Sequence, residues 1–126
     1  MKQLLVICFL AFTSSVYTQN ESAFFSALEN TDTGTMEVYL EDNIDFCLFE
    51  DQQIMTKRAA MTKLKSFLNN HKNIKVEVIH KGVSKDRSSQ YKVAKMTTSR
   101  DVFRVFVFAS GEIGTKTIKE IRIDKF

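Results

Sequence analysis

Residues 74–80 alternate between apolar and polar side chains, which is typical of a strand with one buried face. The Gly- and Ser-rich segment 82–89 predicts a turn. Residues 90–98 then resume an extended pattern, with Tyr91 and Val93 on one face and Ala94 and Met96 on the other. We therefore expect a β-hairpin over 74–98. The buried face of its first strand is predicted to carry Ile74, Val76, Val78 and His80.

Residues 101–109 are β-branched and aromatic on both faces, except at Arg104. This composition predicts a central strand that is covered on both sides. Gly111 and Gly114 bracket a further turn, and residues 116–125 have the interrupted apolar pattern of a bulged or edge strand. Strands joined by such short turns pair in antiparallel fashion.

Helical patterns precede this strand-rich region. Asn20 or Ser22 can cap a first helix, and Asp32 or Thr33 a second short one that reaches about residue 40. The pattern predicts a strand over residues 44–49 and a polar loop over residues 50–53. Thr56 is predicted to cap the longest helix, 57–70. The element order predicts an α+β fold with N-terminal helices packed on a curved antiparallel sheet.

The N-terminus has the pattern of a secretory signal peptide. Lys2 precedes an apolar run over residues 4–12, and small residues follow it. The run is too short for a spanning helix, which needs roughly 20 residues. We expect residues 1–18 to be cleaved, leaving one domain over 19–126 that is secreted or periplasmic and not stably inserted in a membrane. Cys47 would then be the one cysteine left, which excludes an intramolecular disulfide and favours a small buried side chain over a nucleophile.

Charge is distributed unevenly along the chain. Residues 20–51 hold nine acidic and no basic side chains, whereas residues 52–126 hold 17 basic and six acidic ones. In one compact domain this pattern favours mutual neutralisation over an exposed basic face. No nucleic-acid-binding motif is present, and His71 and His80 lack a metal-ligand spacing, so we expect neither nucleic-acid binding, nor a metal, nor a cofactor.

Several short segments of the chain resemble the sequences of a known protein family. They are the run from His80 to Asp86 followed by Tyr91, the triplet 103–105, and Ile118 with residues 120–123. Taken with the element order, they resemble a bacterial family of small secreted proteins designated only as a domain of unknown function, DUF4783. That family looks like the nuclear transport factor two-like fold, a cystatin-like cone shared with ketosteroid isomerase. The resemblance implies this fold, export and a pocket in the cone, and it implies no chemistry.

Arg104 is the most informative candidate, because a guanidinium in an otherwise apolar strand needs a partner. That partner is an internal carboxylate, from Asp45, Glu77 or Glu120, or an anionic ligand. The remaining alternative is that Arg104 is exposed to solvent at the margin of the sheet and needs no such partner. His80, at the end of an apolar face, is either a structural donor or part of the same site. The candidate pocket residues are Arg104, His80, Tyr91, Phe106 and Tyr39.

Three functions are compatible with these residues. The leading hypothesis is a secreted, non-catalytic binding module that holds a small amphipathic or anionic molecule in the cone and is a homodimer or binds an envelope protein. The alternative is a structural or protein-interaction domain that uses the sheet face, with the cone filled by side chains. The third is an isomerase- or hydrolase-type enzyme, with Asp45 as base and Tyr39 or Tyr91 as oxyanion donor.

Overall fold

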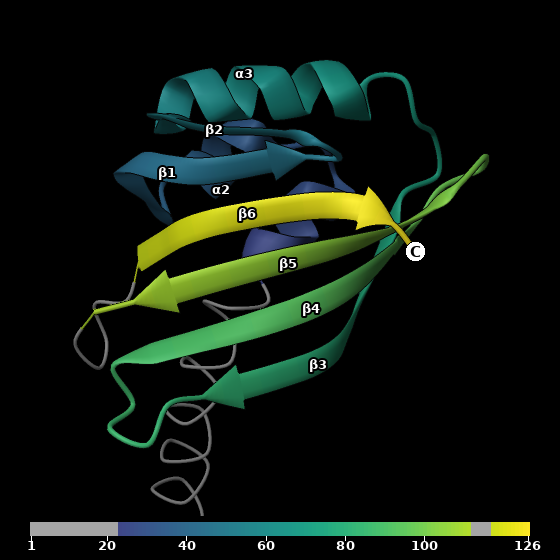
Figure 1. Ribbon diagram of the computed structural model, residues 1–126. Helices are drawn as coiled ribbons and strands as arrows, with labels where there is room; N and C mark the ends of the chain where they lie inside the picture. Colours follow the sequence, from purple (N-terminus) through teal and green to yellow (C-terminus); the bar gives the residue numbers. More distant parts are fainter. Residues whose placement is uncertain (1–22, 112–116) are drawn as a thin grey trace, which may run out of the picture.

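The computed structural model describes residues 23–111 and 117–126 (Figure 1). The predicted signal peptide, the candidate caps Asn20 and Ser22, and Gly114 lie outside these residues. Residues 23–29 are helical, and two further helices follow, α2 (Thr33–Glu37) and α3 (Lys57–Leu68). The strands are β1 (Leu40–Leu48), β2 (Asp51–Thr56), β3 (Lys75–Val83), β4 (Ser89–Thr97), β5 (Val102–Ser110) and β6 (Thr117–Lys125).

The strands form one six-stranded sheet in the order β2-β1-β6-β5-β4-β3. Every neighbouring pair is antiparallel except β1 and β6, which run parallel. Short turns oblige consecutive strands to reverse direction, whereas β1 and β6 are far apart in the chain and are free of that constraint. The last strand therefore lies inside the sheet and is not an edge strand, but it is bulged as expected, because its register with β5 shifts between Phe108 and Ala109.

Helices cover one side of the sheet, which we call the inner face. In Figure 1, α3 lies along β1 and β2, and α2 lies behind β1. Side chains from both layers form one continuous apolar cluster, and its largest fully buried members include Phe46, Phe103, Leu28, Met36, Leu64 and Met96. These side chains form the core between the helices and the sheet.

The helix starts follow the predicted caps. The Thr56 hydroxyl accepts a hydrogen bond from the Ala59 N–H at 3.2 Å, and the Asp32 carboxylate accepts one from the Thr35 N–H at 3.2 Å. A side-chain oxygen at this position satisfies a backbone donor that has no partner within the helix. Helix α2 is shorter than expected, because Leu40 already begins β1.

The polar loop expected over residues 50–53 is wrong. Phe49 adopts a positive φ of 60°, and the chain reverses there into strand β2, which pairs with β1 from Leu48↔Asp51 to Asn43↔Thr56. Most of β2 is exposed. An edge strand with little burial on either face has no apolar alternation by which a sequence pattern could reveal it.

A β-bulge changes the orientation of His80. Val78 pairs with Ala94 and His80 pairs with Val93, so the register shifts at Ile79. One extra residue moves every following side chain to the opposite face. The prediction that His80 shares a face with Val76 and Val78 is therefore wrong, and His80 lies on the side of the sheet away from the helices.

The turn between β3 and β4 is organised by Asp86. Its carboxylate accepts hydrogen bonds from the hydroxyls of Ser84 and Ser88, both at 2.7 Å. The Ser88 and Ser84 hydroxyls, in that order of effect, lower the pKa of Asp86 to about 2. Arg87 follows with a φ of 61°. The predicted turn is confirmed, and side-chain hydrogen bonds stabilise it.

Ion pairs neutralise part of the acidic charge of residues 20–51, in the direction expected. Four cations of the later segment form ion pairs with carboxylates between residues 37 and 51. The pairs are Arg58–Glu37, Lys119–Glu41, Lys57–Asp42 and Lys63–Asp51.

Candidate functional site

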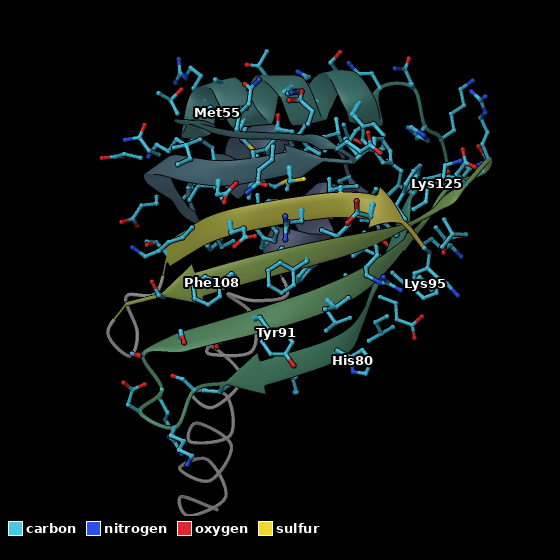
Figure 2. All side chains as sticks on the ribbon, viewed as in Figure 1. Met55, His80, Tyr91, Lys95, Phe108 and Lys125 are labelled. Atoms are coloured by element: carbon cyan, nitrogen blue, oxygen red, sulfur yellow. The ribbon has the colours of Figure 1, made fainter. Side chains whose placement is uncertain are left out.

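Four of the five predicted site residues lie together on the sheet side away from the helices, which we call the outer face. His80 on β3 pairs with Val93, and Val93 on β4 pairs with Phe106 on β5. Tyr91 is two residues before Val93 and pairs with Phe108. Figure 2 shows Tyr91, Phe108, His80 and Lys95 projecting from the same side of β3, β4 and β5.

Tyr91, Val93, Phe106 and Phe108 form what we call the apolar patch. The rings of Tyr91 and Phe106 stack with centroids 6.0 Å apart and planes 24° from parallel. Tyr91 keeps 42% of its surface exposed, and the other three are half-buried. A continuous group of exposed aromatic side chains is uncommon on a monomer and marks an interaction surface.

Gly82 determines how Tyr91 lies on the sheet. The two residues are paired across β3 and β4, and a Cβ added at Gly82 would lie 2.3 Å from Tyr91 Cε1. The ring therefore packs flat against the glycine backbone, which a side chain at position 82 would prevent.

We expect Gly82→Ala to lower the free energy of unfolding by about 1 kcal/mol, because the new methyl group displaces the Tyr91 ring from Gly82 and from Phe106. Urea unfolding followed by circular dichroism measures the loss, and proton nuclear Overhauser contacts report the distance between the rings. Gly34→Ala is the matched control, since its Cβ meets only Asp32 Oδ1 at an ordinary 3.7 Å. Equal stability of the two variants and unchanged ring contacts would contradict this account.

Arg104 is exposed, so its predicted burial and its predicted pairing with an internal carboxylate are wrong. Its guanidinium carbon lies 5.1 Å from the centroid of the Phe126 ring, and the Lys95 ammonium lies 5.2 Å from the same centroid. Both distances suit cation–π contacts. Phe106 and Phe108 on the same face of β5 are only half-buried, because no second layer of described residues covers this face. Arg104 therefore reaches solvent and needs no buried partner.

Tyr39 is not brought to the outer face. Its half-buried ring packs edge to face on Phe24, with centroids 6.3 Å apart and planes at 89°. It precedes β1 and belongs to the margin of the inner cluster. The five predicted residues therefore do not line one pocket.

The opposite half of the outer face, on β1 and β6, is acidic. Asp45 pairs with Glu120 in the parallel ladder, and Asp124 lies opposite Arg104 on β5. The Asp45 carboxylate accepts hydrogen bonds from the Gln52 amide at 3.0 and 3.1 Å.

Arg122 lies within this acidic half. Its Nε is 3.4 Å from Glu120 Oε2. A hydrogen bond with Cys47 and the charge of Glu120, in that order, raise the pKa of Arg122. Cys47 is buried, as predicted, and its thiol donates to the Phe49 carbonyl at 3.1 Å.

The residues nominated for isomerase chemistry are not adjacent. Tyr91, Phe108, Glu120 and Asp45 follow one another across β4, β5, β6 and β1. Three strand spacings separate Tyr91 from Asp45, roughly 14 Å. A general base and an oxyanion donor must both reach one substrate atom in a desolvated site, and these two groups lie far apart on an open face.

A cavity of about 450 Å³ lies elsewhere, on the helices. We call it the helix groove; it is lined by Thr33, Gly34 and Glu37 of α2 and by one side of α3 from Arg58 to Asn69. None of the five predicted residues lines it. No motif in the sequence singled out the groove.

Neither a metal site nor a membrane-spanning helix is found within the described ranges, 23–111 and 117–126. Their His, Cys, Asp and Glu side chains include no group of three or more arranged to hold a metal ion. Their helices include none with the length and apolar character needed to span a bilayer.

The model of the family DUF4783, a domain of unknown function, matches residues 21–124 of the chain. The chain belongs to the DUF4783 family. Among solved structures, it is similar to a DUF4783 family protein from Bacteroides uniformis at 25% identity and a TM-score of 0.74, over 83% of this chain and 95% of that one. A second, from Bacteroides ovatus, matches at 22% identity and a TM-score of 0.74, over 82% and 93% of the two chains.

This DUF4783 protein also shares its fold with NTF2-like proteins. One, of unknown function and from Cytophaga hutchinsonii, has a TM-score of 0.58 at 12% identity, over 82% of this chain and 84% of that one. At that identity the likeness concerns the fold alone. No curated protein matches the chain. The predicted α+β cone fold and the family resemblance are therefore confirmed, and the function has to be argued from the surface.

Proposed function

We propose that this DUF4783 protein is an exported, non-catalytic interaction domain that acts through the outer face of its sheet, and that the occupant of this face is a second copy of the chain. The apolar patch is the observation that carries the proposal. Stacked, partly exposed aromatic rings in the middle of a sheet gain most from burial against a protein surface. The large side chains that are buried between the helices and the sheet favour this function over a small molecule held inside the cone.

Charge complementarity selects a second copy as the partner. The β3–β5 half of the outer face carries Lys75, Lys95 and Arg104 against one carboxylate, Glu77. The β1–β6 half carries Asp45, Glu120 and Asp124 against one guanidinium, Arg122. Consider a two-fold axis that lies in the interface, parallel to the strands and close to β5. Such an axis places the basic half of each copy against the acidic half of the other.

The same axis brings Phe106 and Phe108 of the two copies together at the centre and places Tyr91 and Val93 of each copy against β6 of the other. An apolar centre with a charged rim is the usual anatomy of a specific interface. Export is proposed from the apolar N-terminal run alone, and an envelope protein is the competing occupant of the same face.

A charge exchange tests the pairing. Lys95 and Asp124 lie in one row across the sheet, because both are in register with Arg104. We expect Lys95→Glu and Asp124→Lys each to raise the dimer dissociation constant by ~10-fold, and the double variant to recover most of the loss, since the opposite charges again face each other. Sedimentation equilibrium of the purified protein at several salt concentrations measures these constants.

Lys85→Glu is the control, because it removes an exposed cation from the β3–β4 turn, off the outer face, and should leave the dissociation constant unchanged. A wild-type protein that is monomeric at every concentration would overturn the second copy as partner and favour a different envelope protein. A dimer whose affinity none of the outer-face variants changes would overturn the outer face itself.

A further inference from the structure

The helix groove differs from the outer face in composition and position. Its walls belong to α2 and α3, and no residue of the sheet lines it. It therefore stays open when the outer face is occupied. Its volume of about 450 Å³ falls within the usual range for small-ligand sites. We propose that the helix groove binds a small hydroxylated anion, with sugar acids as the chemical class.

The polar lining is regular in sequence and in space. Arg58, Thr62, Lys65, Ser66 and Asn69 are spaced by three or four residues or are adjacent, so they follow one side of α3. Thr33 faces them from α2. Hydroxyl, amide and ammonium groups that converge on one space are what a polyhydroxylated ligand needs for its hydrogen bonds.

The hydrogen-bonding capacity of this lining is largely unused. Thr62 donates to the Arg58 carbonyl at 2.9 Å, which leaves its oxygen free to accept. Within residues 23–111 and 117–126, the side chains of Thr33, Lys65, Ser66 and Asn69 form no hydrogen bond or ion pair. Met61 is the one apolar side chain in the lining, and it is buried in the core beneath the polar groups.

The charges of the side chains on α3 favour an anionic ligand in the helix groove. Lys57, Arg58 and Lys63 of α3 each pair with a carboxylate. Arg58 pairs with Glu37 inside the groove, at 3.8 Å, so these two charges offset each other. Lys65 is the remaining cation of α3, and it has no carboxylate partner among the described residues. The groove thus offers one uncompensated positive charge beside several neutral hydrogen-bonding groups, which suits a ligand with one carboxylate and several hydroxyls.

Gly34 provides a way to close the groove without disturbing the fold. A Cβ at this position meets only Asp32 Oδ1 at 3.7 Å, an ordinary contact, and Gly34 has no positive φ. A larger side chain is therefore tolerated in α2 and projects into the space that the ligand would fill.

The test is a titration of the ¹⁵N-labelled protein with glucuronate, followed by amide chemical shifts. We expect saturable shifts at Gly34, Lys65 and Ser66, with a dissociation constant of about 1 mM, as befits a ligand of few heavy atoms. Glucose, which lacks the carboxylate, and acetate, which lacks the hydroxyls, should each bind at least ~10-fold more weakly.

Variants decide whether the groove is the site. Lys65→Gln should weaken glucuronate binding by ~10-fold, and Gly34→Leu should abolish it, with the melting temperature of each variant measured to confirm folding. Lys63→Gln is the matched control, because it removes a cation of the same helix that already pairs with Asp51. The absence of groove shifts, equal binding of acetate and glucuronate, or unchanged affinity in Lys65→Gln would each overturn the proposal. These outcomes are independent of the oligomeric state of the protein.

Discussion

Replacing Phe106 with glutamate is expected to convert the proposed dimer into a monomer, with the dissociation constant raised by at least ~30-fold. Phe106 lies in the middle of the apolar patch, between Val93 on β4 and Arg122 on β6. A carboxylate there would be desolvated in the interface, and the stacking with Tyr91 would be lost. Sedimentation velocity across a range of protein concentrations measures the change.

The folded monomer should tolerate this substitution. Phe106 is on the outer face and only half-buried, so the inner cluster is not disturbed. Val38→Glu is the control, since it places the same charge on a side chain that is 77% exposed and lies off the sheet, after α2. Loss of self-association in both variants, or in neither, would contradict the assignment of the outer face as the interface.

Truncation of Phe46 to alanine should have the largest effect on stability, lowering the free energy of unfolding by about 3–5 kcal/mol. Phe46 is fully buried on β1. It pairs with Gln53 on β2 and with Ile121 on β6, so it lies where the two-stranded margin joins the rest of the sheet. Its removal leaves a cavity among side chains from both layers.

Urea unfolding monitored by far-ultraviolet circular dichroism measures this loss, because the chain has no tryptophan for fluorescence. Phe126→Ala is the comparison on the outer side of the sheet. Phe126 is 54% exposed and lies beside the cations Lys95 and Arg104, so its loss should cost less than about 1 kcal/mol at protein concentrations that keep the chain monomeric. Similar losses for both phenylalanines would contradict the described core.

Much of the fold could be predicted from local patterns. The two side-chain oxygens that cap α2 and α3 were identified because capping depends on residues only three positions apart. The alternation in β4 correctly separated Tyr91 from the buried Ala94 and Met96. Neutralisation of the acidic segment by later lysines and arginines followed from composition, since opposite charges in one compact domain lie within reach of each other.

The candidate site was predicted in part. The aromatic side chains and cations of β4 and β5 do gather, but on an open face rather than in a pocket, and Tyr39 is not among them. The sequence of β5 is apolar on both faces, and this pattern fits two structures: an outer face covered by another layer, or an open outer face on which aromatic side chains of neighbouring strands pack together. The structure has the open face, and Arg104 is therefore exposed.

Local sequence patterns were enough to predict the helices, their caps, and the strands with a regular apolar alternation, because these properties depend on neighbours a few positions away. Tertiary structure decided the rest: the parallel contact of β1 with β6, the strand β2, the bulge that turns His80 outward, and the helix groove. Each of these depends on segments far apart in the chain meeting at a particular register. A one-residue shift in that register moves every following side chain to the other face, and no local periodicity records it.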